Sequence, residues 1–108
     1  MKRFTVLILV MLSNPVAAAD IPGARLFSRE CGICHGETGY GTMMLERRLG
    51  KNRSLLRERT DLIPAYVKTV VRHGLASMPP LSRVELSDME LDTIIGYLTH
   101  PETRRGHE

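Results

Sequence analysis

The chain has 108 residues, of which 15 are basic and 12 are acidic, and its formal net charge at pH 7 is +3. So small an excess of positive charge argues against nucleic acid as a partner. The length allows one small domain, and a polypeptide of this size buries only a limited hydrophobic core of its own.

The N-terminus has the pattern of an export signal. A Lys-Arg pair is followed by an uncharged, mostly apolar run over residues 4–12, and residues 17–19 are three alanines. The apolar run covers about nine residues, far fewer than the roughly 20 that span a bilayer. We therefore expect cleavage near Ala19-Asp20 and no stable membrane anchor.

The expected division is a signal peptide over residues 1–19 and one domain over residues 20–108, located in the periplasm. Lys2 and Arg3 leave with the signal, so 13 basic residues face 12 acidic ones in the mature chain. The mature chain is therefore close to electrical neutrality before any cofactor is added.

Helices are predicted along most of the mature chain. Pro22 to Glu30 is expected to be a short helix, because proline suits the first helical position. Residues 36–42 contain three glycines and are expected to be a loop. Residues 43–60 are compatible with a short helix or with an ordered loop.

The second half contains two further predicted helices. Asp61 is expected to be an N-cap, with Pro64 in the first turn and Gly74 ending the helix. Residues 75–84 are expected to form an extended loop, because two adjacent prolines there cannot donate backbone hydrogen bonds.

Ser87 and Glu90 form the pattern of a capping box at the start of the last helix, which is expected to end near Thr99. The polar tail from Glu102 onward is expected to fray. No strand-like alternation of useful length is present, so the predicted fold class is all-α. The apolar stripe of the last helix consists of Leu91, Ile94, Ile95 and Leu98.

The pentapeptide Cys31-Gly32-Ile33-Cys34-His35 is the pattern of a c-type haem attachment site. On a helical turn, cysteines three positions apart share a face, so both thiols can reach the two vinyl groups on one porphyrin edge. His35 can then place an imidazole nitrogen on the iron. The motif predicts one covalently attached haem c.

Other interpretations of the cysteine pair are weaker. A disulfide across so short a loop would restrain the unfolded chain very little. A thioredoxin-type pair needs neighbouring strands, and none is predicted. A zinc site needs four ligands, and His73, His100 and His107 fit no zinc-finger spacing.

Haem iron held by one histidine needs a sixth ligand for electron transfer, and methionine raises its reduction potential. Met78 is the main candidate, because it precedes two prolines in a stiff loop between two helices. His73 is the alternative ligand. Met43 and Met44 are expected to be flexible packing residues, and Met89 an ordinary helix side chain.

These features resemble class I cytochromes c over nearly all of residues 22–99. In that family an N-terminal helix crosses a C-terminal helix at a glycine and two aromatic side chains, which Gly23, Phe27 and Tyr97 match. The stretch from Tyr66 to Pro79 is most similar to small cytochrome subunits that accept electrons from flavoprotein hydroxylases such as 4-cresol dehydrogenase. The resemblance implies a small cytochrome c fold of three to five helices around one covalently bound haem.

The resemblance also implies roles for individual residues. Cys31 and Cys34 would carry the thioether bonds, and His35 and Met78 would be the axial ligands of iron. The family supports this histidine through a backbone carbonyl, often of a proline in the next loop, but no proline lies between residues 36 and 63. The haem propionates need cationic partners, and the candidates are Arg47, Arg48, Arg53 and Arg72.

Two functions are compatible with these residues. The first is a one-electron carrier rather than an enzyme, with a redox partner protein such as a flavoprotein dehydrogenase as donor. The second is a haem-based catalytic or gas-binding protein with a displaceable sixth ligand, which would need a distal acid–base group. Only His73 lies near Met78 in the sequence as such a group.

Charged residues are segregated along the chain. Residues 46–60 have a local balance of +4, whereas residues 85–92 carry four acidic residues and no basic one. This pattern indicates either two solvated surfaces or a dipolar molecule whose approach to a partner is steered by charge.

Overall fold

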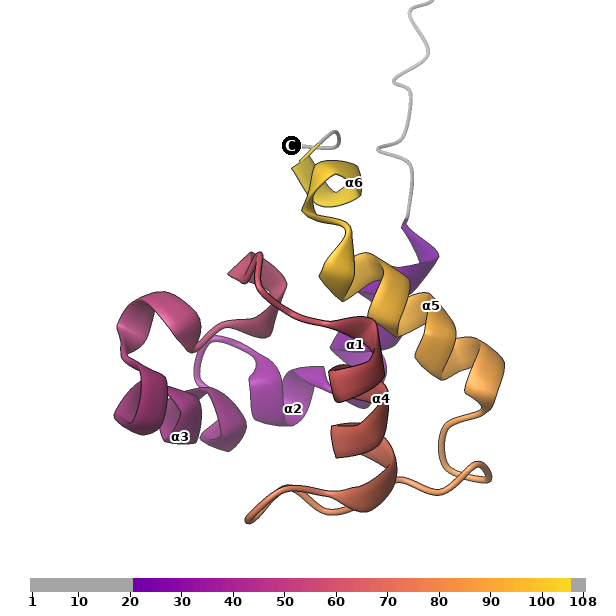
Figure 1. Cartoon of the computed structure of the whole chain (residues 1–108), viewed down its shortest axis with the longest axis horizontal. Coiled ribbons are helices and arrows are strands. Elements are labelled where there is room, and N and C mark those ends of the chain that lie inside the picture. Colours follow the sequence, from indigo (N-terminus) through magenta and orange to yellow (C-terminus); the bar gives the residue numbers. More distant parts are fainter. Residues whose placement is uncertain (1–20, 106–108) are drawn as a thin grey trace, which may run out of the picture.

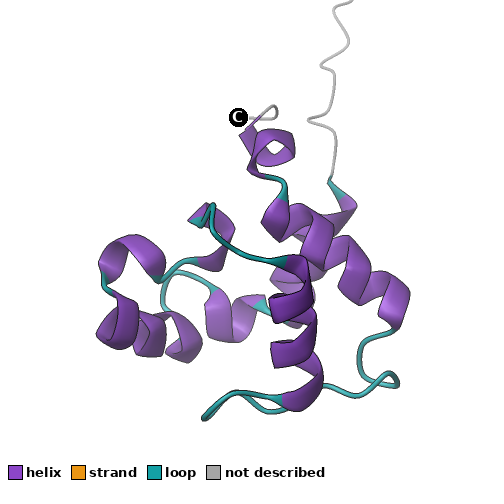
Figure 2. Ribbon diagram, viewed as in Figure 1, coloured by secondary structure: helices purple, strands orange, loops and turns teal. Residues whose placement is uncertain are grey.

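The computed structural model describes residues 21–105, so the export signal predicted for residues 1–19 lies outside the described range. Helices and loops make up residues 21–105, with no strand among them, which confirms the all-α fold class (Figures 1 and 2). In chain order the elements are α1 (Pro22–Glu30), α2 (Gly32–His35), α3 (Tyr40–Leu49), the 3₁₀ turns η1 (Lys51–Arg53) and η2 (Leu56–Glu58), α4 (Pro64–His73), α5 (Asp88–Thr99) and α6 (Pro101–Arg105).

The core lies where α1 crosses α5, two helices from opposite ends of the described chain (Figure 1). Gly23 allows their close approach, because a Cβ atom there would lie 2.5 Å from Tyr97 Cβ and 2.9 Å from the Thr93 carbonyl oxygen. Phe27 packs beside Tyr97, with ring centroids 5.9 Å apart. The crossing implied by the family resemblance is therefore present.

α5 supplies most of this core. Its predicted stripe of four apolar side chains is buried, and Phe27, Val71 and Leu86 complete the cluster. The predicted capping box is also formed: the Glu90 N–H donates to Ser87 Oγ, and the Ser87 N–H donates to the Glu90 carboxylate. The prediction of this helix is confirmed at both its start and its apolar face.

The chain after α2 is more helical than predicted. The loop expected for residues 36–42 ends at Gly39, which is the N-cap of α3, so the prediction is wrong for residues 40–42. Glycine at position 41 serves close packing against the preceding turn, not chain flexibility. Residues 43–60, for which helix and loop were both open, form the rest of α3 and two 3₁₀ turns.

This part of the molecule has almost no hydrophobic core. No apolar side chain of residues 32–58 is fully buried, and the buried side chains there are the polar Thr42 and Ser54. Thr42 Oγ1 donates to the Gly36 carbonyl, and Ser54 Oγ donates to the Lys51 carbonyl. Local hydrogen bonds therefore maintain a region that the polypeptide itself does not fill.

The helix expected after Asp61 begins at Pro64, and its N-cap is Ile63, so the prediction of Asp61 as N-cap is wrong. The Asp61 carboxylate instead accepts hydrogen bonds from Arg59 and Arg53, which hold its pKa far below the usual range. The predicted end of this helix at Gly74 is confirmed, with a φ of 76° at that residue.

The predicted frayed tail is partly helical. α6 begins with Pro101 as its first residue. The Arg104 guanidinium donates to the carbonyl oxygens of Arg57 and Arg59. The Arg104 guanidinium also lies 5.8 Å from the centroid of the Tyr97 ring. Within residues 21–105, no helix is long and apolar enough to cross a membrane.

Candidate haem-binding site

The cysteine–histidine motif forms one helical turn directly after α1. The Cys31 N–H donates to the Phe27 carbonyl at 2.8 Å, so the motif continues from the core helix. The His35 N–H then donates to the Cys31 carbonyl at 2.8 Å, and the Cys34 N–H donates to the same oxygen at 3.2 Å. Cys31, Cys34 and His35 are thus held on a single turn, as their spacing predicts.

The two thiols are free and lie in different surroundings. Cys31 is half-buried and packs against the core, whereas Cys34 is exposed. Burial raises the pKa of the Cys31 thiol to about 11, with a smaller contribution from the negative charge of Glu30. Cys31 is therefore a neutral thiol at physiological pH and, like Cys34, is not committed to a disulfide.

The His35 imidazole is packed against Gly41 of α3. A Cβ atom at position 41 would lie 2.9 Å from His35 Cε1, 3.1 Å from His35 Nδ1 and 2.8 Å from the Cys34 carbonyl oxygen. Nδ1 is buried and has no hydrogen-bond partner among the described residues. Gly41 therefore limits rotation of the ring by contact, whereas the carbonyl support implied by the family resemblance is not formed within the described residues.

Burial also lowers the pKa of His35, which favours the neutral imidazole. A neutral ring has a lone pair available for a metal. Because Nδ1 is buried, Nε2 is the nitrogen that a metal can reach in this conformation.

Met78 lies in a tight turn after α4. Leu75 and Met78 exchange two backbone hydrogen bonds, from the Leu75 N–H at 3.1 Å and from the Met78 N–H at 2.9 Å. Ala76 has a positive φ of 51°, an uncommon conformation for a residue other than glycine. Gly74 packs so closely that a Cβ atom there would lie 2.7 Å from the Met78 carbonyl oxygen. The loop is ordered by specific contacts in addition to its prolines.

The side chain of Met78 is half-buried against the same core that Cys31 contacts. The helices involved differ: α4, which leads to Met78, packs on α5, whereas α2 packs on α1 and α3. Met78 and the cysteine–histidine turn are therefore anchored to one core through separate helices.

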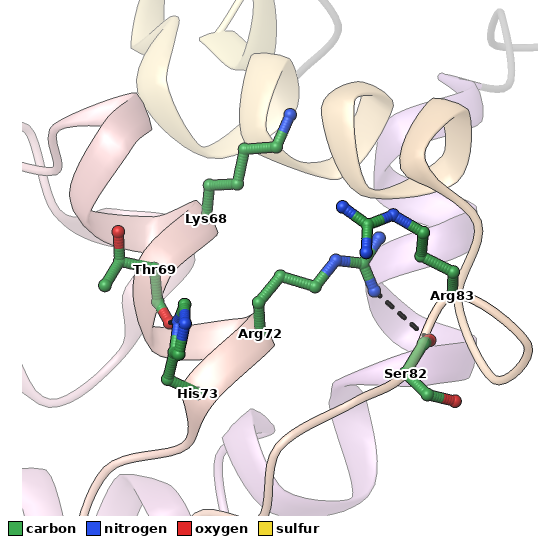
Figure 3. Close-up of a pocket in the computed structure, with 6 residues that line it drawn as sticks. All are labelled: Lys68, Thr69, Arg72, His73, Ser82 and Arg83. Carbon is green, nitrogen blue, oxygen red and sulfur yellow. Dashed lines mark hydrogen bonds between the residues drawn. The ribbon is translucent and has the colours of Figure 1, made fainter.

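The other candidate ligands have different environments. Met89 is 80% exposed on α5, and the Met43 sulfur lies 3.9 Å from Arg47 Nη2. His73 Nδ1 is hydrogen-bonded with the Thr69 carbonyl at 3.0 Å, and His73 borders a shallow cavity of about 490 Å³ (Figure 3). Besides His73, that cavity is lined by Lys68, Thr69, Arg72, Ser82 and Arg83.

The arginines considered for the propionates also differ. Arg53 pairs with Asp61, and Arg72 is engaged by backbone carbonyls and Asp88, so neither guanidinium is unoccupied. Arg47 and Arg48 are exposed in the last turn of α3. Arg47 and Arg48 form no ion pair among the described residues, so they remain the candidates for binding the propionates.

The described residues fit a covalently bound haem. Two free thiols and a neutral imidazole follow one another on one turn, which is the donor set that the cofactor needs. Among the described residues, Ile33 on the same turn is 87% exposed, and Ile63 and Tyr66 at the start of α4 are 64% and 54% exposed.

Comparison with known proteins agrees with this chemistry. A family model described as "Cytochrome C oxidase, cbb3-type, subunit III" matches residues 18–98, which is more than half of the chain. The chain belongs to this family of cytochrome c domains. Such a domain has haem c as its cofactor and electron transfer as its role. No curated protein and no solved structure matches the chain.

Two residues important to this cytochrome c domain escape prediction from its sequence. Gly41 was assigned only to a loop, although its proximity to His35 makes it part of the site. Arg72 was considered for the propionates, although its guanidinium binds the chain that follows Met78. No spacing rule predicts either contact, because Gly41 meets His35 across the loop before α3 and Arg72 meets residues 81 and 82 across the Met78 loop.

Proposed function

We propose that this cytochrome c domain is a mono-haem electron carrier of the periplasm, with a single haem bound covalently by Cys31 and Cys34. In this proposal His35 and Met78 are the axial ligands of the iron. The observation that carries the proposal is the turn of residues 31–35, on which two free thiols precede a neutral imidazole held against Gly41.

When bound, the haem supplies a one-electron couple at its iron. The protein residues supply position and environment. Gly41 restricts rotation of the His35 ring, and the Leu75–Met78 turn restricts the methionine. Two axial side chains held in this way would keep the coordination unchanged between oxidation states, which limits the reorganisation that accompanies electron transfer.

The redox partners are proposed from resemblance. The Tyr66–Pro79 stretch is similar to subunits that receive electrons from flavoprotein hydroxylases, so a periplasmic flavoprotein dehydrogenase is the proposed donor. The description of the matched family names an oxidase subunit, which supports a terminal oxidase as acceptor. The catalytic alternative needs His73 as its distal acid–base group and has less support. His73 Nδ1 is hydrogen-bonded with the Thr69 carbonyl of its own helix, and the ring lines the cavity of Figure 3, whose lining does not include Met78.

Substitution of Met78 tests the ligand assignment. In the haem-loaded Met78→Ala protein we expect loss of the His/Met absorption spectrum in both oxidation states, a lower reduction potential and ready binding of carbon monoxide by the reduced form. Absorption spectroscopy and potentiometric titration of the wild-type and variant proteins measure these changes.

Met89→Ala is the matched control, because it removes the same side chain from an exposed helical position. It should retain the wild-type spectrum. If Met78→Ala also retained it, Met78 would not be the ligand, and the proposed coordination would be wrong.

Surface charge provides a second test of the carrier function. Arg57 pairs with Glu37, and Arg53 and Arg59 share Asp61, so half of the basic residues between positions 46 and 60 already take part in ion pairs. Among the described residues, no ion pair is formed by Arg47, Arg48 or Lys51 near the end of α3. If these three steer an acidic partner, Arg48→Glu should slow reduction by the donor by severalfold to about tenfold at low ionic strength.

Stopped-flow reduction measured over a series of salt concentrations would detect this effect. The wild-type rate should fall as salt increases, and the difference between wild type and Arg48→Glu should shrink. Arg57→Gln, which removes a charge already paired with Glu37, is the control and should change the rate less. A wild-type rate that is independent of salt would rule out steering.

A further inference from the structure

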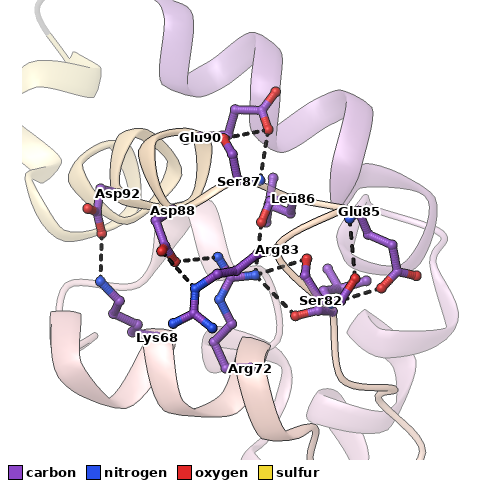
Figure 4. A network of polar contacts seen from close by, with 11 residues as sticks. Lys68, Arg72, Ser82, Arg83, Glu85, Leu86, Ser87, Asp88, Glu90 and Asp92 are labelled. Atoms are coloured by element: carbon purple, nitrogen blue, oxygen red, sulfur yellow. Dashed lines mark hydrogen bonds and ion pairs between the residues drawn. The ribbon is translucent and has the colours of Figure 1, made fainter.

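Arg72 connects α4 to the chain segment that follows Met78. Its side chain is only 10% exposed. Nη1 donates to three backbone carbonyls of that segment: those of Ser82 at 3.1 Å and Leu86 at 2.9 Å, which Figure 4 labels, and that of Leu81 at 3.1 Å. One buried guanidinium therefore binds the backbone of residues 81–86 at three carbonyl oxygens.

The same guanidinium also reaches α5. Nη2 donates to Asp88 Oδ1 at 2.8 Å, and Asp88 is the first residue of that helix. Arg83 Nε donates to the other carboxylate oxygen, Asp88 Oδ2, from an exposed position (Figure 4). Arg72 thus joins three segments, whereas Arg83 contributes only one end of an exposed ion pair.

These contacts close the Met78 loop at its far end. At the near end, Gly74 packs against the Met78 carbonyl and Pro80. At the far end, the Leu81 N–H donates to the Val71 carbonyl at 2.8 Å, directly beside the bonds made by Arg72. The loop of residues 74–80 is consequently fixed to α4 at both ends, with Met78 between the fixed points.

We propose that Arg72 is a positioning residue for the sixth ligand: by binding the Leu81, Ser82 and Leu86 carbonyls, it holds the 74–80 loop so that Met78 stays on the haem iron. This inference rests on the proposed function, in which Met78 is the axial ligand. Arginine suits the task because its planar guanidinium presents several donors in fixed directions. A lysine ammonium at the same place cannot serve the carbonyls and Asp88 with the same geometry.

The test compares haem-loaded Arg72→Met, Arg72→Lys and Arg83→Ala with the wild-type protein. Loss of charge-assisted hydrogen bonds from a buried arginine should release the loop, so the reduced Arg72→Met protein should bind carbon monoxide about tenfold or more tightly than wild type. Exchange of the Leu81 amide hydrogen, followed by NMR in the reduced protein, should accelerate by a similar factor.

The controls separate positioning from general stability. Arg83→Ala, which loses a partner of the same Asp88, should leave carbon monoxide affinity and Leu81 exchange unchanged. The amide of Leu91, in the core part of α5, should exchange at the wild-type rate in Arg72→Lys. If Arg72→Met yields no folded protein, Arg72→Lys carries the same comparison, with a smaller expected change in the same direction.

Several outcomes would overturn the inference. Wild-type carbon monoxide affinity in both Arg72 variants would do so, as would equal effects of Arg83→Ala, or uniform acceleration of Leu81 and Leu91 exchange. A wild-type spectrum without methionine ligation would instead refute the proposed coordination. Leu81 exchange in the Arg72 variants would then still report whether the guanidinium fixes the loop.

Discussion

Gly41→Ala is expected to yield a protein with covalently attached haem but impaired bonding of His35 to the iron. The added methyl group would lie 2.9 Å from the His35 ring and 2.8 Å from the Cys34 carbonyl oxygen, and the latter belongs to backbone that cannot turn aside. Overpacking of this kind costs about 1–3 kcal/mol. That cost exceeds the roughly 1 kcal/mol by which alanine is favoured over glycine inside a helix.

Thermal unfolding and absorption spectra of the loaded Gly41→Ala protein would measure both consequences. Gly32→Ala is the matched control, because it adds the same methyl group to α2, the turn that carries His35, but 3.8 Å from its nearest neighbour. We expect the control to keep the wild-type spectrum. Equal behaviour of the two variants would show that the Gly41 contact does not orient His35.

Gly23→Ala is expected to cause the other large effect, at the crossing of α1 and α5. The new Cβ atom would lie 2.5 Å from Tyr97 Cβ and 2.9 Å from the Thr93 carbonyl oxygen, so the helices would have to separate. The clash is expected to cost about 3 kcal/mol, so the net loss of stability is up to about 2 kcal/mol after the gain in helix propensity, a large part of the stability of a small domain. Urea denaturation of the loaded protein measures it.

Gly96→Ala provides the control for this experiment. Gly96 also lies within α5, but a Cβ atom there would have no neighbour within 4 Å. Its replacement should therefore stabilise the protein by up to about 1 kcal/mol through helix propensity. If Gly23→Ala behaved like Gly96→Ala, the close approach of α1 and α5 would not be required for stability.

Local sequence signals predicted those elements whose cause is itself local. The stripe from Leu91 to Leu98 has helical spacing, and the Ser87–Glu90 pair satisfies the first turn of α5, so both could be read without knowing any partner. The proline at position 22 and the glycine at position 74 likewise mark helix ends through their own backbone preferences.

Predictions failed where a tertiary contact overrides a local preference. Asp61 is a good N-cap by type, but Arg53 and Arg59 bind its carboxylate, and the helix begins three residues later. The glycines of residues 36–42 are typical of a loop, but Gly41 lies in a helix. The His35 ring packs so closely against it that no side chain fits there. The Arg59 contact is only two residues from Asp61, but the Arg53 contact spans eight residues and the Gly41–His35 contact spans six, beyond the reach of a local capping or turn rule.

The candidate site divides in the same way. The turn that holds Cys31, Cys34 and His35 follows from their spacing, because a helical turn is local. The support of His35 by Gly41 and the fixing of the Met78 loop by Arg72 involve residues whose types allow many roles. An arginine in the last turn of a helix is usually interpreted as a cation that favours the helix dipole, and only the positions of the carbonyls reveal the actual partners of Arg72.

The placement of the buried apolar residues at the α1–α5 crossing has a consequence for the order of events during biosynthesis. On the proposed export route the chain emerges with its N-terminal end first, so α1 and the cysteine–histidine turn leave the translocation pore long before α5, the partner that would bury Phe27. Until then, residues 31–35 have no finished core to dock against. If the chain is exported in this way, both thiols would be accessible to a haem-attaching enzyme during the interval before α5 emerges.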